Sequence, residues 1–268
     1  MVTTYLAGGL GNQMFQIAVA LNHAKKNKDT AVFDLGNSHT PRQGENVSKY
    51  KGKLFQFNHM TNVYDKCDNV FTQPSHGYCE IPYEENQQLH GFFQSEKFFF
   101  EYKDEISNQF RDNLKFGYVD RWNTIVNHLE HIRNMFDVPV VSIHIRRGDY
   151  LKLAHIHTPC PIGYYSEAMK TMKEKVGDFH AYFISDDIEW CRKVFDGHGS
   201  FSKYVEEIDD LILMTNSDHN IIANSSFSWW GAYLNDNKNK VVIGPKRWFG
   251  PSGPQDQEDT IPNEWIKI

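Results

Sequence analysis

Apolar positions near the start of the chain follow helical spacing between two short β-rich runs, residues 3–7 and 31–35. The helix is predicted by apolar residues that recur at i, i+3, i+4 and i+7: Met14, Phe15, Ile17, Ala18, Leu21 and Ala24. The order of strand, glycine-rich loop, helix and strand is typical of the beginning of a parallel α/β sheet. We therefore expect such a sheet in the N-terminal part of the chain.

A second α/β series begins after residue 137. Residues 139–145 have the nearly continuous apolar character of a buried parallel strand. The patterns that follow predict helices at 163–175, 187–195, 209–216 and 227–236, and strands at 180–185, 219–223 and 240–243. We therefore expect two α/β halves with a boundary near residues 136–138.

The stretch between the two series is less regular. Residues 36–80 are polar and rich in glycine and proline, which predicts loops and short elements over a variable surface. Residues 89–93 predict a strand, and 95–115 and 120–135 predict helices.

The composition excludes several classes of protein and of binding partner. The chain has 268 residues, of which 40% are hydrophobic and 23% charged, so a disordered or fibrous protein is excluded. The formal net charge of −6 argues against nucleic acid as a partner, so a polyanion site must be a local basic cluster. Four scattered cysteines, with no recognisable signal peptide or membrane span, predict a cytoplasmic location; peripheral membrane contact stays open.

The first candidate motif is Gly-Gly-Leu-Gly-Asn-Gln at residues 8–13, between the first strand and helix. Glycines let the backbone approach a ligand closely, and a helix start offers N–H groups and a positive dipole end. The loop nearly matches the dinucleotide-binding fingerprint, but Met14 stands in place of its third glycine. On this segment alone, a ligand loop and an ordinary tight turn both fit.

The second motif is Ser-Ile-His-Ile-Arg-Arg-Gly-Asp-Tyr at residues 142–150. His144 and Arg146 alternate at the C-terminal end of a predicted strand, which is where open α/β sheets bind ligands. Arginine can bind phosphate oxygens bidentately. The alternative is a structural ion pair, for example Arg147 with Asp149. Two arginines directly after an apolar strand favour the binding function.

The third motif spans residues 219–231, where a buried strand ends in hydroxyl and amide side chains at a helix start. Ser226 is predicted as the N-cap residue. These groups suit a second contact with an anion, and Phe227 could stack on a base. We interpret Trp229 and Trp230 as core residues.

Together the three motifs resemble glycosyltransferase family 11, the α-1,2-fucosyltransferases. Each motif alone is a weak signal, whereas their order along nearly the whole chain is specific; residues 36–80 and the extreme C-terminus are unmatched. The matching stretches are residues 8–16, 89–98, 144–150, 157–165, 183–190 and 210–234.

The resemblance implies a GT-B-like fold of two facing Rossmann-type halves, with the GDP-L-fucose donor in the cleft. The half 138–268 would bind the donor, and the half 1–137, with the glycine loop, would be the acceptor side. The implied activity is inverting transfer of L-fucose from GDP-β-L-fucose to the 2-hydroxyl of a galactose-containing glycan. No cofactor is expected, and the absence of an Asp-x-Asp triplet argues against a metal that bridges the diphosphate.

The resemblance also implies roles for single residues. Arg146 would contact the β-phosphate and Asn12 would reach the fucose and diphosphate, and these two form the expected catalytic set. Asp210, or its neighbour Asp209, would bind guanine. The donor-binding set implied in this way is Gly9, Gly11, Asn12, His144, Arg146, Asp210, Ser226 and Phe227. No residue is assigned as a general base.

Two other functions stay open at this point. A nicotinamide-dependent oxidoreductase would use the loop from Gly8 to Gly11, with Asp34 binding the ribose. A non-catalytic glycan-binding module would bind sugar without turnover, although the intact 144–150 motif argues against it. If the chain is a transferase, we expect acceptor identity to depend on residues 36–80 and 151–162.

Overall fold

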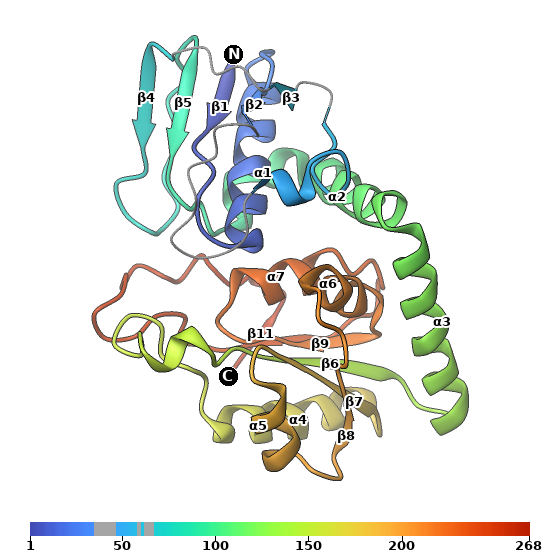
Figure 1. The fold of residues 1–268 in the computed structure, drawn as a ribbon. Helices are drawn as coiled ribbons and strands as arrows, with labels where there is room; N and C mark the ends of the chain where they lie inside the picture. The colour runs from blue at the N-terminus through green and yellow to red at the C-terminus, as the bar shows by residue number, and fades with distance from the viewer. Residues whose placement is uncertain (35–46, 58–59, 62–66) are drawn as a thin grey trace. The chain divides into compact units, whose positions relative to one another are not determined.

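The computed structural model describes residues 1–34, 47–57, 60–61 and 67–268 and contains two compact units. The first unit comprises Met1–Gly117 with Asp256–Pro262, and the second comprises Tyr118–Gln255 with Asn263–Ile268. Each unit has its own parallel β-sheet (Figure 1). The expected α/β class is therefore confirmed.

The first unit contains a three-stranded sheet in the order β1-β5-β4, and β2 pairs with β3. A parallel bridge joins Val2 to Ala31, so the chain returns beside β1 after the first helix, as the β-loop-α-β prediction requires. Its elements are β1 (Val2–Thr4), α1 (Leu10–Lys26), β2 (Phe33–Asp34), the 3-10 helix η1 (Val47–Tyr50), β3 (Met60–Thr61), β4 (Asn69–Thr72), β5 (Gln87–His90), the 3-10 helix η2 (Glu96–Tyr102) and α2 (Lys103–Gly117).

Helix α1 is buried on most of its surface. Met14, Phe15, Ile17 and Val19 are completely inaccessible to solvent, because the helix packs against β1, η2 and α2. A helix covered on several sides needs apolar residues beyond a single stripe. The helical prediction from residues 14–24 is confirmed, and the helix extends further at both ends.

The second unit contains a six-stranded sheet in the order β11-β10-β9-β6-β7-β8, with all pairs parallel. The helices and strands predicted after residue 137 are all present, with bounds shifted by a few residues. The elements are α3 (Val119–Phe136), β6 (Val140–Ile145), the 3-10 helix η3 (Asp149–Leu151), α4 (Ile162–Val176), β7 (His180–Ser185), α5 (Ile188–Val194), β8 (Gly199–Phe201), α6 (Glu207–Asn216), β9 (His219–Ile221), α7 (Ser226–Tyr233), β10 (Val242–Gly244) and β11 (Ile266–Lys267).

Helices cover both faces of this six-stranded sheet. Helices α4 and α5 lie on one face and α6 and α7 on the other (Figure 1). Every residue of the central strand β6 is buried, as expected for a strand covered on both faces. None of the helices in the described part of the chain is both long and apolar enough to cross a membrane.

The two units divide at Gly117–Tyr118, earlier than the expected boundary at residue 137. Helix α3 belongs to the second unit because it contacts β6, β7 and α6, with Ile125, Leu129 and Ile132 on its buried side. Arg133 near the end of α3 also donates from Nε to Asp218 Oδ2 at 2.8 Å.

Candidate active site

The strand order of the second unit reverses at β6. From β6 the chain continues to β7 and β8 on one side and then returns to β9 on the other side. Open α/β sheets bind ligands at such a switch point, at the carboxyl ends of the strands. His144 in β6 and Phe227 in α7, directly after β9, meet there with ring centroids 5.7 Å apart. The structure therefore brings together two of the predicted donor-binding residues.

The imidazole of His144 is uncharged at neutral pH. Its side chain is almost completely buried, and this burial, followed by the nearby charge of Arg146, lowers the pKa of His144 to about 3. Its Nδ1 has no hydrogen-bond partner among the described residues. His144 therefore offers a neutral hydrogen-bonding group next to Phe227 and does not act as a cation for phosphate.

The guanidinium of Arg146 is held between two carboxylates. One terminal nitrogen lies 2.7 Å from Asp149 Oδ1, and the other lies 3.1 Å from Asp186 Oδ2. About one third of the side chain is exposed. Because a guanidinium has five N–H donors, these two ion pairs leave donors for a ligand. Arg146 is thus fixed in position and still able to bind phosphate oxygens.

Arg147 has a structural role instead. Its Nε lies 3.0 Å from Asp187 Oδ2, and its guanidinium stacks 4.2 Å from the ring centre of Trp190 in α5. The sequence alternative that paired Arg147 with Asp149 is wrong, because Asp149 pairs with Arg146. Of the two consecutive arginines after β6, Arg147 is therefore engaged with α5, and Arg146 keeps N–H donors for a ligand.

Asp186 is a residue of this site that sequence reasoning missed. Besides its ion pair with Arg146, its Oδ1 accepts the backbone N–H of Arg147 at 2.9 Å. A Cβ at Gly148 would lie 2.6 Å from Asp186 Oδ2, so a larger residue there would displace the Asp186 carboxylate from its place beside Arg146. The signal in the sequence is a pair of carboxylates, Asp186 and Asp187, directly after a predicted buried strand.

The start of α7 presents backbone N–H groups. Ser225, not Ser226, is the N-cap residue, and no side chain caps the helix. The prediction for Ser226 is wrong by one position, because the first helical turn closes from Trp229 N–H to the Ser225 carbonyl at 2.9 Å. The N–H groups of Ser226 and Phe227 therefore lack intrahelical acceptors. Trp229 and Trp230 are completely buried, as predicted.

Asn224 holds the neighbouring loops against this helix start. Its Nδ2 donates to the carbonyls of Thr158 and Trp248, at 2.9 Å each. The Tyr150 hydroxyl donates to the Asn224 carbonyl at 3.0 Å and so joins the loop after β6 to the loop after β9. The two loops that frame His144 and Phe227 are therefore fixed to each other.

His157 and Cys160, in the segment before α4, contact the loops of this site. His157 stacks on Tyr150 with ring centroids 4.9 Å apart, and Cys160 Sγ lies 3.4 Å from Asn224 Oδ1. No group of three or more His, Cys, Asp or Glu that could hold a metal occurs among the described residues.

Asp209 and Asp210 at the start of α6 differ in their environments. Asp209 Oδ2 accepts from Arg121 at 2.8 Å. Asp210 Oδ1 accepts a hydrogen bond from Ser202 Oγ at 2.6 Å. Burial, with smaller effects from Asp209 and Glu207, raises the pKa of Asp210 to about 7. Asp210 therefore changes its charge in the physiological pH range.

The glycine loop of the first unit forms an uncapped helix start. Gly9 is the N-cap residue of α1 and has no side chain to cap it. Its carbonyl accepts the N–H groups of Asn12 and Gln13, at 3.0 and 3.1 Å. The N–H groups of Leu10 and Gly11 are left without intrahelical acceptors. This is a potential binding site for an anion.

Gly8 and Asn12 shape this loop. Gly8 has a φ of +78°, and a Cβ there would lie 2.5 Å from Asn12 Nδ2. Gln94 Nε2 donates to Asn12 Oδ1 at 2.6 Å, which directs the amide N–H₂ of Asn12 away from Gln94. A Cβ at Gly9 would meet nothing within 4 Å. The loop is thus tightly packed at Gly8 and open at Gly9.

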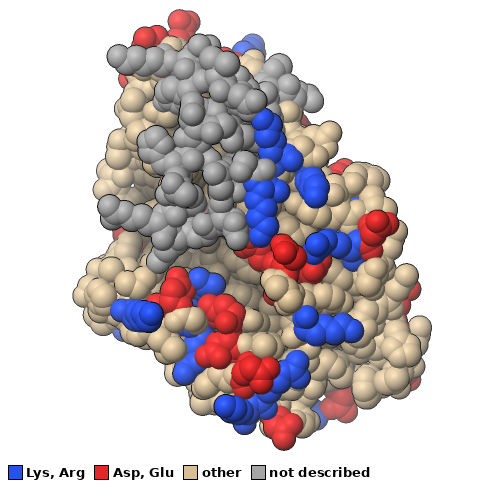
Figure 2. Space-filling view, viewed as in Figure 1, with Lys and Arg blue, Asp and Glu red and all other residues tan. Residues whose placement is uncertain are grey.

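Acidic and basic side chains lie close together on one face of the second unit (Figure 2). The pairs of Arg146 and Arg147 with their aspartates follow the same pattern. An anionic ligand would therefore be bound by local donors at the ends of β6 and β9.

The oxidoreductase alternative requires Asp34. This residue ends β2, and its side chain lies outside the described part of the structure. The family comparison below does not favour this alternative or the non-catalytic module.

Comparison with solved structures supports the GT-B-like fold class. The chain is similar to the NodZ fucosyltransferase from Bradyrhizobium, with a TM-score of 0.53 and 11% identity over 86% of this chain and 90% of that one. It is also similar to the NodZ α-1,6-fucosyltransferase soaked with GDP-fucose, with a TM-score of 0.51 and 11% identity over 87% and 92% of the two chains.

Sequence comparison identifies the family. An α-1,2-colitosyltransferase from Escherichia coli is 30% identical, over 100% of this chain and 99% of its own length. The O-antigen biosynthesis glycosyltransferase WbnK of Escherichia coli is 29% identical over 98% and 99%. A galactoside α-(1,2)-fucosyltransferase 1 from Lagothrix lagotricha is 29% identical over 55% and 42%. The model of glycosyl transferase family 11 matches residues 1–268. The chain therefore belongs to glycosyltransferase family 11.

Proposed function

We propose that this glycosyltransferase moves L-fucose from GDP-β-L-fucose to the 2-hydroxyl of a galactose unit in a glycan, with inversion and without a metal. The observation that carries the proposal is Arg146, which is held by Asp149 and Asp186 at the end of β6 with N–H donors to spare. This is the position at which an open α/β sheet binds its ligand.

The reaction joins the acceptor oxygen to C1 of fucose. The galactose 2-hydroxyl attacks C1 from the face opposite GDP, and the bond between C1 and the β-phosphate oxygen breaks. The electron pair of that bond leaves with GDP, and the hydroxyl proton passes to solvent. The β-linked donor gives an α-linked product. Negative charge therefore grows on the β-phosphate in the transition state.

Fixed donors of this chain would stabilise that charge. Arg146 binds the β-phosphate, and the free N–H groups at the start of α7 and in the glycine loop bind the diphosphate. His144, neutral because of its lowered pKa, donates or accepts one hydrogen bond beside the nucleotide. Asp210 binds guanine, Phe227 stacks on the base, and we assign no general base.

A colitose donor is the second candidate to be tested. The α-1,2-colitosyltransferase from Escherichia coli is 30% identical along its full length, which favours a colitose donor as the second candidate. Colitose is L-fucose without its 3-hydroxyl. A site that hydrogen-bonds this hydroxyl discriminates strongly against the deoxy sugar, because a buried polar group would lose its partner.

The proposal predicts fucosyl transfer that survives metal chelation. The purified protein is incubated with EDTA, a β-galactoside and either GDP-fucose or GDP-colitose, and the products are analysed for linkage. We expect an α-1,2-fucosylated product from GDP-fucose at an undiminished rate. Loss of transfer with EDTA, restored by added metal, would contradict the metal-free mechanism. Transfer of colitose but not fucose would contradict the proposed donor.

The open space at Gly9 provides a second prediction. Gly9→Ala adds a methyl group that meets no atom within 4 Å apart from those of its chain neighbours, so the fold should be retained. If the diphosphate approaches this backbone, we expect KM for GDP-fucose to rise about tenfold or more. The matched control is Gly163→Ala in α4, where the added Cβ also meets nothing within 4 Å. Equal donor KM in both variants would remove Gly9 from the donor site.

The binding partners and the cellular location that we propose follow from the same chemistry. The partners are GDP-fucose and a galactose-containing glycan, with the second unit as the donor side and the first as the acceptor side. All four cysteines are free thiols, which supports the proposal of a reducing, cytoplasmic location.

A further inference from the structure

A large pocket opens in the first unit beside the C-terminal part of α1. It has a volume of about 770 Å³ and lies between the last turns of α1, the segment from Tyr78 to Tyr83 and the 3-10 helix η2. We call it the α1–η2 pocket. All its lining residues belong to the first unit.

Three exposed aromatic rings line this pocket. Tyr78 is 43%, Tyr83 39% and Phe100 56% exposed. Single exposed aromatic residues are ordinary, but several around one pocket are typical of a binding surface. Aromatic faces suit the apolar C–H faces of sugar rings. The arrangement therefore fits a carbohydrate.

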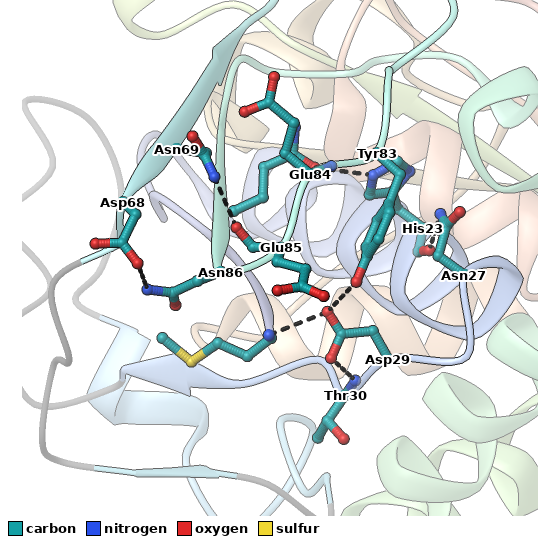
Figure 3. Close-up of polar contacts among 12 residues, drawn as sticks. His23, Asn27, Asp29, Thr30, Asp68, Asn69, Tyr83, Glu84, Glu85 and Asn86 are labelled. Carbon is teal, nitrogen blue, oxygen red and sulfur yellow. Dashed lines mark hydrogen bonds and ion pairs between the residues drawn. The ribbon is translucent and has the colours of Figure 1, made fainter.

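Two of these aromatic rings are held in place. Tyr83 packs on His23 with ring centroids 5.9 Å apart, and its hydroxyl donates to Asp29 Oδ2 at 3.1 Å (Figure 3). Tyr78 packs on Phe98 at 5.1 Å, and its backbone N–H donates to Asp259 Oδ2 at 3.3 Å. Binding to fixed rings costs less conformational entropy than ordering mobile ones.

Polar groups between the rings match the hydroxyls of a neutral ligand. Glu80 and Glu101 provide carboxylate acceptors, and Lys26 lies 3.5 Å from Glu101. Asn22 Oδ1 accepts the Tyr102 N–H at 3.2 Å, which leaves the amide N–H₂ as a donor. Paired charges do not favour an anionic nucleotide, and the polar lining does not favour a lipid chain. A neutral oligosaccharide fits both features.

We propose that the α1–η2 pocket binds the sugars of an oligosaccharide acceptor that lie beyond the reacting galactose; this rests on the proposed function. Asn22 and Lys26 follow Asn12 by ten and fourteen residues on the same helix, which is ~15–21 Å along its axis. A single galactose that receives the fucose near the start of α1 does not span this distance, whereas a longer glycan does. The pocket therefore selects acceptors by length.

The test compares a short and a long acceptor. Initial rates with GDP-fucose are measured for methyl β-galactoside and for lacto-N-neotetraose, whose terminal β-galactose is followed by three sugars. Tyr78→Ala is expected to raise KM for the tetrasaccharide about tenfold. KM for methyl β-galactoside and both kcat values should stay within about twofold. The matched control is Phe116→Ala in α2, an exposed aromatic residue outside the pocket lining.

The outcomes separate this inference from the proposed function. If the wild type fucosylates both acceptors and Tyr78→Ala changes neither KM, the pocket proposal is wrong and the proposed function stands. If the wild type fucosylates neither acceptor, saturation-transfer NMR with lacto-N-neotetraose tests the pocket directly. Binding that Tyr78→Ala abolishes and Phe116→Ala retains supports the pocket. Absence of binding to the wild type overturns it.

Discussion

Arg146→Ala is expected to lower kcat/KM for fucosyl transfer by about 10²- to 10³-fold, the usual cost of removing one fixed donor from a developing negative charge. The loss should lie mainly in kcat, because charge on the β-phosphate grows as the bond to fucose breaks. The measurement is steady-state kinetics with GDP-fucose and a saturating galactoside. Activity within a few-fold of the wild type would exclude the assigned role of Arg146.

Two further variants test whether the loss of activity is specific to the guanidinium of Arg146. Arg146→Lys should recover little of the activity, because an ammonium group cannot contact Asp149, Asp186 and a phosphate in one plane as a guanidinium can. Arg192→Ala removes an exposed arginine of α5 that pairs with Glu189, and should leave the rate within about twofold. Thermal unfolding of all three variants checks that the fold is intact.

The central helices and strands were predictable because a buried element leaves a local pattern of apolar residues in the sequence. The strand β6 and the helix α1 are surrounded by protein, so most of their buried positions are apolar. The edge strands β4, β8 and β11 were not predicted. A strand with one neighbour needs no apolar run, and Val70 in β4 is 55% exposed. The expected strand at 89–93 ends at His90, because the N–H groups of Phe92 and Phe93 donate to Gln73 Oε1 and not to a strand.

The candidate site was predictable only where its residues are neighbours in sequence. His144 and Arg146 were found because they alternate at one strand end. Asp186 was missed because its contact with Arg146 depends on β7 pairing with β6, and single-sequence patterns do not give strand order. The environment of Asp210 was equally hidden, since burial in the folded chain is what raises its pKa.

Asp210 is expected to make donor binding depend on pH around 7. Guanine presents N–H donors, so an ionised carboxylate is the form that binds it. Because burial raises the pKa of Asp210 to about 7, the free protein holds this residue mostly protonated at pH 6 and mostly ionised at pH 8. Affinity for GDP-fucose should therefore fall as pH decreases, approaching ~tenfold per pH unit well below 7. The measurement is calorimetry with GDP-fucose. GDP is avoided because its terminal phosphate itself titrates near pH ~6 and would add a second pH dependence.

Asp210→Asn should bind weakly at pH 8 and show no such pH dependence. The matched control is Asp209→Asn. It removes a neighbouring charge that raises the pKa of Asp210, so the dependence should persist with its midpoint at lower pH. A wild-type affinity that is constant from pH 6 to 8 would show that Asp210 does not bind guanine through its ionised form.

Folding stability should follow pH in the opposite direction to donor binding. The folded-state pKa of Asp210 lies above its ordinary value of 3.8, so its contribution to stability is fully present below 3.8 and is lost as pH rises through about 7. Asp210→Asn should therefore have a higher Tm than the wild type at pH 8, and the difference should shrink as pH falls towards 5. The ionised carboxylate, which we propose binds guanine, is thus the form that burial penalises. A Tm difference independent of pH would mean that Asp210 is not held in the buried environment that raises its pKa.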